Sequence, residues 1–384
     1  MKMSLLNGRY TGAVALLAAA AMMITTEAVV AQNTQHYVQT NLVSNQASLA
    51  PTVDANLANP WGLSRSSKGP WWVADNGTGL STLYDGTGKT IPLVVTIPSG
   101  DTSASLTGSP TGTVFNGDAT AFVLPNGKAA SFLFVTEDGT ISGWNGGTSA
   151  VIVVNRKQDA VYKGATVGTR MVNGVPKSFL YAANFRSGKV DVYDSTFAAV
   201  MVSGGEAGEE RGEEDNDSFT DEHLPRGYAP FNVQNLGGNI FVSFAKQDSA
   251  RHDEVDGAGL GYVDVFSPAG KLLQRMQHGA WFDAPWGMAI APSDFGAYSH
   301  DVLVGQFGSG RIAVFNPVTG KFLGMLENAK NEPITIDGLW ALSPGNGASA
   351  GPATSMYFTA GIDHEKNGLF GTIAAVENVQ GNDQ

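Results

Sequence analysis

The sequence predicts an all-β protein folded as a six-bladed β-propeller, and three observations support this fold class. Short stretches alternate apolar and polar residues, as at 240–243, or are fully apolar, as at 132–135, which is typical of buried strands. Glycine provides 48 of the 384 residues, and dipeptides such as Asn76-Gly77 favour tight hairpins. A short motif also recurs six times, with a period that matches propeller blades of about four strands each.

The recurring motif precedes each group of strands and ends in a small residue. Its fourth position is occupied by Gly62, Gly112, Gly164, Asn232, Gly287 and Gly338. Successive copies lie 50 to 55 residues apart, except for one interval of 68 residues between Gly164 and Asn232. That interval contains an acidic segment at about 204–223, which we interpret as an inserted loop between blades three and four. Small residues are expected in the motif because the innermost strands converge on the propeller axis.

The last two blades predict how the ring closes. Blade five has four strand-like stretches, at 286–291, 301–306, 311–316 and 321–326. Blade six repeats the first three, at 338–342, 355–360 and 369–376, and then the chain ends. The segment 37–43 is the only strand-like stretch left unused, so we expect it to pair with blade six. This pairing would close the ring and cover an otherwise open strand edge.

The first 31 residues have the order of a secretory signal peptide. Lys2 and Arg9 precede an apolar stretch at 13–24, and small residues lead to Ala31 and the polar Gln32. The apolar stretch is shorter than the roughly 20 residues that span a bilayer, so no membrane span is expected. We therefore expect cleavage after Ala31, export to the periplasm or the extracellular space, and a single propeller domain at 32–384. Because the chain has no cysteine, ring closure and core burial must supply its stability.

The charge of the chain is strongly negative and unevenly distributed. The formal net charge is −12, and nine acidic residues but only one basic residue lie between Glu206 and Glu222. The sequence contains no basic patch, so a nucleic-acid partner is not expected. We expect a monomer whose partner is a small ligand or another protein.

Several motifs resemble a family of secreted, functionally uncharacterised bacterial proteins related to the NHL-repeat propellers. The matching stretches, in order along the chain, are 59–62, 74–79, 137–141, 181–185, 227–232, 259–263, 284–287 and 336–340. The resemblance implies an NHL/TolB-like propeller and brings no established activity. A more distant likeness to six-bladed lactonases and gluconolactonases, which hold a catalytic calcium in the channel, carries over no ligand residues and is analogy of fold.

Two sets of loops are expected to open on one face of the propeller. The residues before the first strands form one ring, Trp61, Thr111, Lys163, Phe231, Trp286 and Asp337. The residues after the second strands form another, Asp75, Glu137, Asn184, Lys246, Gln306 and Gly361. A channel mouth with aromatic walls and a few polar groups is where a ligand is expected.

Within this face, Lys163 and Asp337 belong to blades three steps apart and should face each other across the mouth. We expect a small polar or anionic ligand held by Lys163, oriented by Asp337 and flanked by aromatic walls and polar groups, with Trp61, Trp286, Phe231, Glu137, Asn184, Lys246 and Gln306 as the other site residues. The alternative is that the aromatic residues pack between blades, that acidic residues such as Asp75 and Asp138 bind local backbone amides, and that water fills the channel.

Metal binding and catalysis remain open from the sequence. Calcium is a possible cofactor, with oxygen ligands from Glu137, Asp138, Asn184 and Asp337, although no EF-hand loop occurs. The clusters 252–254 and 363–365 lie in longer loops and lack the His spacing of zinc sites. The first hypothesis is a binding or interaction module that uses the channel-mouth face. The second is a calcium-assisted lactonase-type hydrolase or lyase in the channel, and the third is a structural surface protein.

Overall fold

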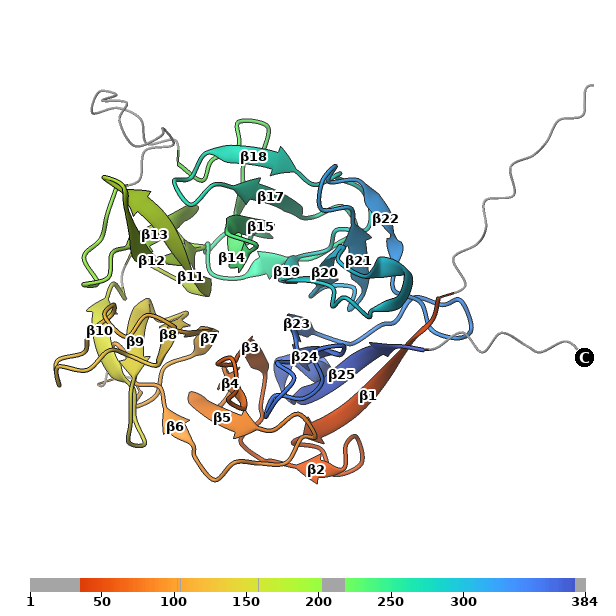
Figure 1. Ribbon diagram of the computed structural model, residues 1–384, viewed down its shortest axis with the longest axis horizontal. Helices are drawn as coiled ribbons and strands as arrows, with labels where there is room; N and C mark the ends of the chain where they lie inside the picture. Colours follow the sequence, from red (N-terminus) through yellow and green to blue (C-terminus); the bar gives the residue numbers. More distant parts are fainter. Residues whose placement is uncertain (1–34, 102, 104, 158, 202–217, 377–384) are drawn as a thin grey trace, which may run out of the picture. The chain divides into compact units, whose positions relative to one another are not determined.

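Six β-sheets surround a central axis in the computed structural model, which describes residues 35–101, 103, 105–157, 159–201 and 218–376 (Figure 1). All of these residues belong to one compact unit. The all-β, six-bladed propeller predicted from the sequence is therefore confirmed. Among these residues, no helix is both long enough and apolar enough to cross a membrane.

The first three blades follow one another along the chain. Blade one contains β3 (Pro60–Ser64), β4 (Trp71–Asp75), β5 (Leu80–Tyr84) and β6 (Val95–Thr96). Blade two contains β7 (Pro110–Phe115), β8 (Phe132–Thr136), β9 (Thr140–Trp144) and β10 (Val151–Asn155). Blade three contains β11 (Tyr162–Val172), β12 (Val175–Asn184) and β13 (Lys189–Tyr193). Within the described residues blade three is thus one strand short of its neighbours.

The other three blades complete the ring. Blade four contains β14 (Tyr228–Leu236), β15 (Asn239–Gln247), β17 (Tyr262–Phe266) and β18 (Leu272–Arg275), and the short β16 (Glu254–Val255) also pairs with β15. Blade five contains β19 (Pro285–Ile290), β20 (Val302–Gln306), β21 (Ile312–Phe315) and β22 (Phe322–Met325), with the 3-10 helix η1 (Gly296–Tyr298) between its first two strands. Blade six contains β23 (Leu339–Pro344), β24 (Met356–Ala360) and β25 (Leu369–Ala375), with α1 (Ile362–Glu365) before β25.

The two ends of the chain close the ring as the sequence predicts. The N-terminal strand β1 (Tyr37–Ser44) pairs antiparallel with β25, and the short β2 (Thr52–Val53) pairs parallel with β1. Tyr37 and Val43 are buried, so β1 contributes to the core as well as to the sheet edge. The predicted pairing of 37–43 with blade six is confirmed (Figure 1).

The innermost strand pair of every blade contains a β-bulge. The register shifts between Pro60 and Leu63 in blade one, and at the equivalent point of the five other blades. A bulge adds residues to one strand and redirects their side chains. The redirected residues include Trp61, Thr111, Lys163, Phe231, Trp286 and Trp340.

This register corrects one expectation from the sequence. Leu339 pairs with Ala360 just as Pro60 pairs with Asp75, so Trp340 is the blade-six counterpart of Trp61. The motif at 335–338 is therefore offset by three residues from the structural repeat. Asp337 precedes the innermost strand and does not occupy the ring position expected for it.

The small residues of the motif are explained by crowding between neighbouring innermost strands. A side chain at Gly112 would lie 2.6 Å from the backbone nitrogen of Ala165 in the next blade. The carbonyl oxygen of Trp340 in blade six would likewise obstruct a side chain at Gly287 in blade five. The reason proposed from the sequence holds at both positions.

Two regions singled out from the sequence lie largely outside the described residues. Neither the predicted signal peptide at 1–31 nor most of the acidic loop at 204–223 is described. The end of that loop, at 218–223, packs on blade four. Phe219 is buried among apolar residues that include Tyr181 and Phe266, and its backbone amide donates to the Gly270 carbonyl.

Candidate functional site

Lys163 is a buried cation close to the propeller axis. It lies in the bulge of β11, and its side chain is 1% exposed. Its Nζ lies 2.6 Å from Glu137 Oε1, 3.2 Å from Asp253 Oδ1 and 3.9 Å from Glu254 Oε2. Together with two adjoining side chains these residues form what we term the axial cluster: Glu137, Lys163, His252, Asp253, Glu254 and Glu365.

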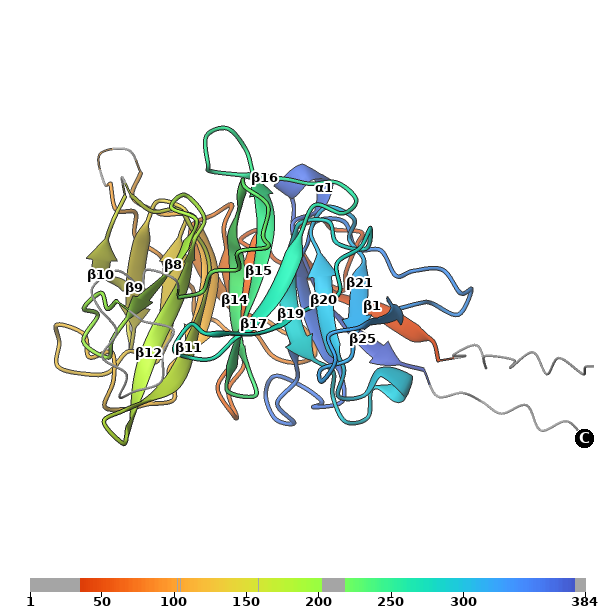
Figure 2. The same ribbon diagram turned by 90° about the horizontal axis from the view of Figure 1, so that it is seen from above.

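The axial cluster is assembled at one end of the propeller by loops from several blades. Glu137 follows β8, residues 252–254 lie between β15 and β17, and Glu365 ends α1 between β24 and β25. Each of these loops joins the second and third strands of its blade. Figure 2 shows β16 and α1 at the same end of the molecule. The cluster therefore lies on the face where the sequence predicts a channel mouth.

Aromatic side chains close the axis next to Lys163. The ammonium group lies 5.1 Å from the Trp61 ring centroid, within cation–π distance, and Trp61 stacks on Trp340 at 3.5 Å. Phe231 and Trp286 lie 6.4 and 6.0 Å from Trp61, although these residues come from different blades. All four rings are buried. They therefore pack against one another at the axis rather than forming open walls for a ligand.

A chain of side-chain amides holds the carboxylates in place. Asn76 donates from Nδ2 to Glu137 Oε2 at 2.8 Å, and Asn59 donates to Glu365 Oε1 at 3.0 Å. Trp340 in turn donates from Nε1 to Asn59 Oδ1 at 3.0 Å. The polar cluster is thus connected by hydrogen bonds to the aromatic residues beneath it, which limits how far its carboxylates can move.

Burial and crowding of like charges set the electrostatics of the cluster. Burial raises the pKa of Glu254 to about 7, against the opposing effect of Lys163. Burial also raises the pKa of Glu365, while the hydrogen bond from Asn59 lowers it. Burial alone would lower the pKa of Lys163, but Glu137, Glu254 and Asp253 raise it above its usual value. Four carboxyl groups therefore surround one ammonium group that stays protonated.

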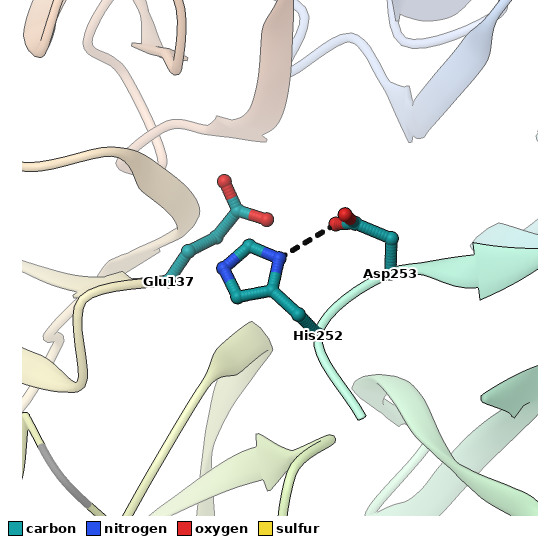
Figure 3. Close-up of side chains that lie close together, drawn as sticks. All are labelled: Glu137, His252 and Asp253. Atoms are coloured by element: carbon teal, nitrogen blue, oxygen red, sulfur yellow. Dashed lines mark hydrogen bonds and ion pairs between the residues drawn. The ribbon is translucent and has the colours of Figure 1, made fainter. Parts of the chain in front are cut away.

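His252 and Asp253 form a pair beside Glu137. The imidazole Nδ1 lies 2.8 Å from Asp253 Oδ1, and this hydrogen bond raises the pKa of His252 and holds that of Asp253 below its usual value. Glu137, His252 and Asp253 each offer a ligand atom, and these atoms all lie within 4.8 Å of one another. Figure 3 shows the three side chains pointing toward one another from two loops. Two carboxylates and an imidazole form a mixed oxygen and nitrogen donor set.

Of the predicted site residues, the structure brings Lys163 and Glu137 together and places Asp337 elsewhere. The exposed Asp337 accepts a hydrogen bond at 2.8 Å from the backbone amide of Asp363. The expected pairing of Lys163 and Asp337 across the mouth is therefore corrected. Lys163 has carboxylate partners from other blades, and Trp340 takes the ring position expected for Asp337.

The remaining predicted polar residues bind their own surroundings. Asp138 accepts from the backbone amides of Gly100 and Ser109, both at 3.0 Å. The Asn184 amide donates to Asp191 at 3.0 Å, and the Gln306 amide accepts from Asp283 N at 2.9 Å and donates to Val304 O at 2.9 Å. Lys246 is exposed at the end of β15. None of the three residues proposed with Glu137 as calcium ligands thus joins it in a common described cluster.

The sequence alone does not assign His252, Asp253, Glu254 and Glu365 to the site. It predicts longer loops for both segments, and no local motif connects them with Lys163. A usable signal is nevertheless present, because both loops follow the second strand of a blade and thus begin at the predicted mouth. Loops longer than their neighbours at that position can reach the axis.

No protein-family model matches the chain. A protein of Acanthamoeba polyphaga mimivirus, "Uncharacterized protein R648", is 28% identical over 342 residues, which cover 86% of this chain and 78% of the viral protein. Among solved structures, a glucose dehydrogenase superposes with a TM-score of 0.52 at 12% identity, covering 88% of this chain and 100% of that one. A Bacteroides thetaiotaomicron protein of unknown function superposes with a TM-score of 0.51 at 10% identity, covering 89% of this chain and 76% of that one.

These comparisons agree with the architecture described above. The two solved structures are similar in fold, and identities this low carry no activity or ligand to this chain. The expected restriction to bacterial proteins is not supported, because the mimivirus relative is a viral protein. That relative is uncharacterised, as the resemblance implied for relatives of this chain.

Proposed function

We propose that this protein is a ligand-binding propeller that takes up a small cation at the axial cluster. The observation that carries the proposal is the charge balance around Lys163. Glu137, Asp253, Glu254 and Glu365 converge from three blades, and Lys163 is the one lysine or arginine that forms an ion pair with any of them within the described residues. Negative charge gathered near a partly dehydrated axis favours a second cation.

The positions of Glu137, His252 and Asp253 support a metal ion as one such cation. Their donor atoms are close enough to share an ion, and the imidazole suits Mn²⁺ or Zn²⁺ better than Ca²⁺, which prefers an all-oxygen site. An organic ammonium ion would satisfy the same carboxylates. An anion at Lys163 is less well supported than the sequence suggested, because three carboxylates already surround this ammonium group.

Calorimetric titration of chelator-treated protein tests this proposal. We expect binding of Mn²⁺, Zn²⁺ or tetramethylammonium, and Glu137→Gln should weaken it roughly tenfold or more because a charged ligand becomes neutral. Glu222→Gln removes the same charge from an exposed side chain of blade four and should leave binding unchanged. The metal and ammonium titrations distinguish the two sources of charge. If neither binds, or if the two variants behave alike, the proposal fails.

The His252–Asp253 pair supports a second candidate, a metal-assisted hydrolase or lyase. The hydrogen bond at Nδ1 fixes the orientation of the ring and leaves Nε2 for a substrate proton, which is the arrangement of a general base. The side chain is 41% exposed, so a substrate can reach it. Lactone turnover by the metal-loaded protein that is lost in His252→Asn, while metal binding persists, would favour this candidate. Turnover that His252→Asn leaves intact would exclude this role for His252.

We also propose that residues 1–31 direct export. The proposal rests on the order of basic, apolar and small residues in that segment. Sequencing the N-terminus of the protein recovered outside the cytoplasm should give Gln32 as the first residue. Recovery of the intact N-terminus there would contradict the cleavage.

A further inference from the structure

A cavity of about 470 Å³ lies at the end of the axis opposite the axial cluster. It is lined by the far ends of innermost strands, among them Arg65 in β3, Thr113 in β7 and Gln234 in β14. Each of these strands begins near the buried aromatic rings, so the rings separate the cavity from the axial cluster. Its volume falls within the roughly 300–1,000 Å³ typical of small-molecule sites.

The cavity contains a buried polar group that lacks a partner. Thr113 is 7% exposed, and its Oγ1 makes no hydrogen bond within the described residues. Native proteins pair nearly all such groups, so an unpaired one that lines a cavity points to a bound partner. The side chains of Gln234 and Ser343 also line the cavity and have no hydrogen bond to another described residue.

Arg65 gives the cavity its charge. Its Nε donates to the Pro344 carbonyl at 2.7 Å and its Nη2 to the Gly345 carbonyl at 3.1 Å, and the guanidinium lies 5.3 Å from the Trp71 ring centroid. These contacts fix the group and leave Nη1 unused. Of the described residues that line the cavity, Arg65 is the only charged one. A guanidinium held in this way suits a carboxylate or a phosphate.

We propose that this cavity binds a small anion that carries several hydroxyl groups, such as a sugar acid or a sugar phosphate. The carboxylate or phosphate binds Nη1 of Arg65, and the hydroxyl groups pair with Thr113, Gln234 and Ser343. Leu63, Val114 and Val167 provide apolar walls. This site has the opposite charge preference from the axial cluster and does not depend on the cation proposed there.

Titration of the full-length protein with D-glucuronate, D-glucose 6-phosphate and D-glucose tests this site, because the three probes share hydroxyl groups and differ in charge. At least one of the two anions should bind more tightly than glucose, and comparing them distinguishes carboxylate from phosphate. Arg65→Met should weaken anion binding roughly tenfold or more. Thr113→Val should weaken the binding of each probe by roughly fivefold without loss of folding, since the hydroxyl group has no internal partner.

Two control variants separate this site from other effects. Ser142→Ala removes another buried and unpartnered hydroxyl group of blade two that does not line the cavity, and it should leave binding unchanged. Glu137→Gln alters the opposite end of the axis and should also have no effect. The proposal is overturned if neither anion binds at low-millimolar concentration, if glucose binds as tightly as both anions, or if Thr113→Val binds like Ser142→Ala. Because the threonine variant needs no arginine partner, the test stands even where Arg65→Met fails to fold.

Discussion

Two buried charged residues of this propeller are treated in opposite ways. Lys163 at the axis is 1% exposed and has carboxylate partners from blades two and four. Asp264 on β17 of blade four is 3% exposed, yet its Oδ2 has no hydrogen-bond partner among the described residues. One charge is neutralised by a network, whereas the other group escapes the cost of burial by keeping its proton.

The difference follows from where each residue lies in the fold. At the axis, loops from several blades meet, so oppositely charged groups distant in sequence can surround one side chain. Within a blade, the neighbours of a residue are set by strand register, and Asp264 lies opposite Arg275 on the adjacent β18. Arg275 is already engaged by Asp221, to which it donates two hydrogen bonds of 2.6 Å. Charge compensation is thus extensive at the axis and incomplete on blade four.

Replacing Lys163 should have the largest effect, because the axial network depends on it. Lys163→Met keeps most of the side-chain volume but leaves Glu137, Asp253 and Glu254 without their shared cation. We expect the free energy of unfolding to fall by about 3–5 kcal/mol at pH 7, as for other broken buried ion pairs. Denaturant titration measures this loss.

A second substitution sharpens that prediction. Adding Glu254→Gln to Lys163→Met should recover part of the lost stability, since one of the uncompensated carboxylates is then neutral. A loss below about 1 kcal/mol for Lys163→Met would place the pair among weak surface ion pairs and remove the contrast with Asp264.

Asp264 should give the opposite result, a gain of stability on replacement. Burial, with a contribution from Asp221, raises the pKa of Asp264 from 3.8 to about 8. Between these two pH values the folded protein retains a proton that the unfolded chain has lost, so the free energy of unfolding falls as pH rises from about 4 to 8. Asp264→Asn removes this dependence and should stabilise the protein by about 1–3 kcal/mol at pH 8, with little change at pH 4.

The measurement for Asp264 is a series of denaturant titrations from pH 4 to pH 8. Asp221→Asn serves as a comparison, because it removes a carboxylate that is already paired with Arg275. A parallel pH dependence in the parent protein and in Asp264→Asn would contradict the raised pKa.

The sequence was sufficient for the architecture because each blade repeats the same local signals. Strand patterning and turn residues predicted blade five almost strand by strand, and the leftover segment 37–43 predicted the closure by β1. Blade six shows the limit of this reasoning. Gly338 resembles the motif glycine of other blades, yet the β-bulge places Trp340 and Ala341 at the repeat position. A bulge depends on pairing between strands and leaves no local mark.

The candidate site was only partly accessible from the sequence. Lys163 stood out because it replaced an aromatic residue of the repeat, and Glu137 because it followed a second strand. Their partners Asp253 and Glu254 lie about ninety residues further along the chain from Lys163, in a loop whose reach the sequence does not encode locally. Asp138 and Asn184 have the right chemistry for a metal, but turn and strand geometry direct them to local partners.

The smallest effect is expected at Arg275, which tests how far blade four compensates its charges. Its hydrogen bonds lower the pKa of Asp221 to about 2. A lowered pKa stabilises the folded state above the ordinary value of 3.8, and this contribution is lost as pH falls toward 2. Because the Arg275 side chain is 45% exposed, solvent screens the pair, and Arg275→Gln should cost no more than about 1 kcal/mol at pH 7. The cost should nearly vanish at pH 2.5 and shrink in high salt, as for a surface ion pair. In the Asp264→Asn background the cost should not increase, since the neighbouring group is then always neutral. A cost of several kcal/mol that salt does not change would mean that Arg275 compensates both carboxylates, and the contrast between blade four and the axis would then be wrong.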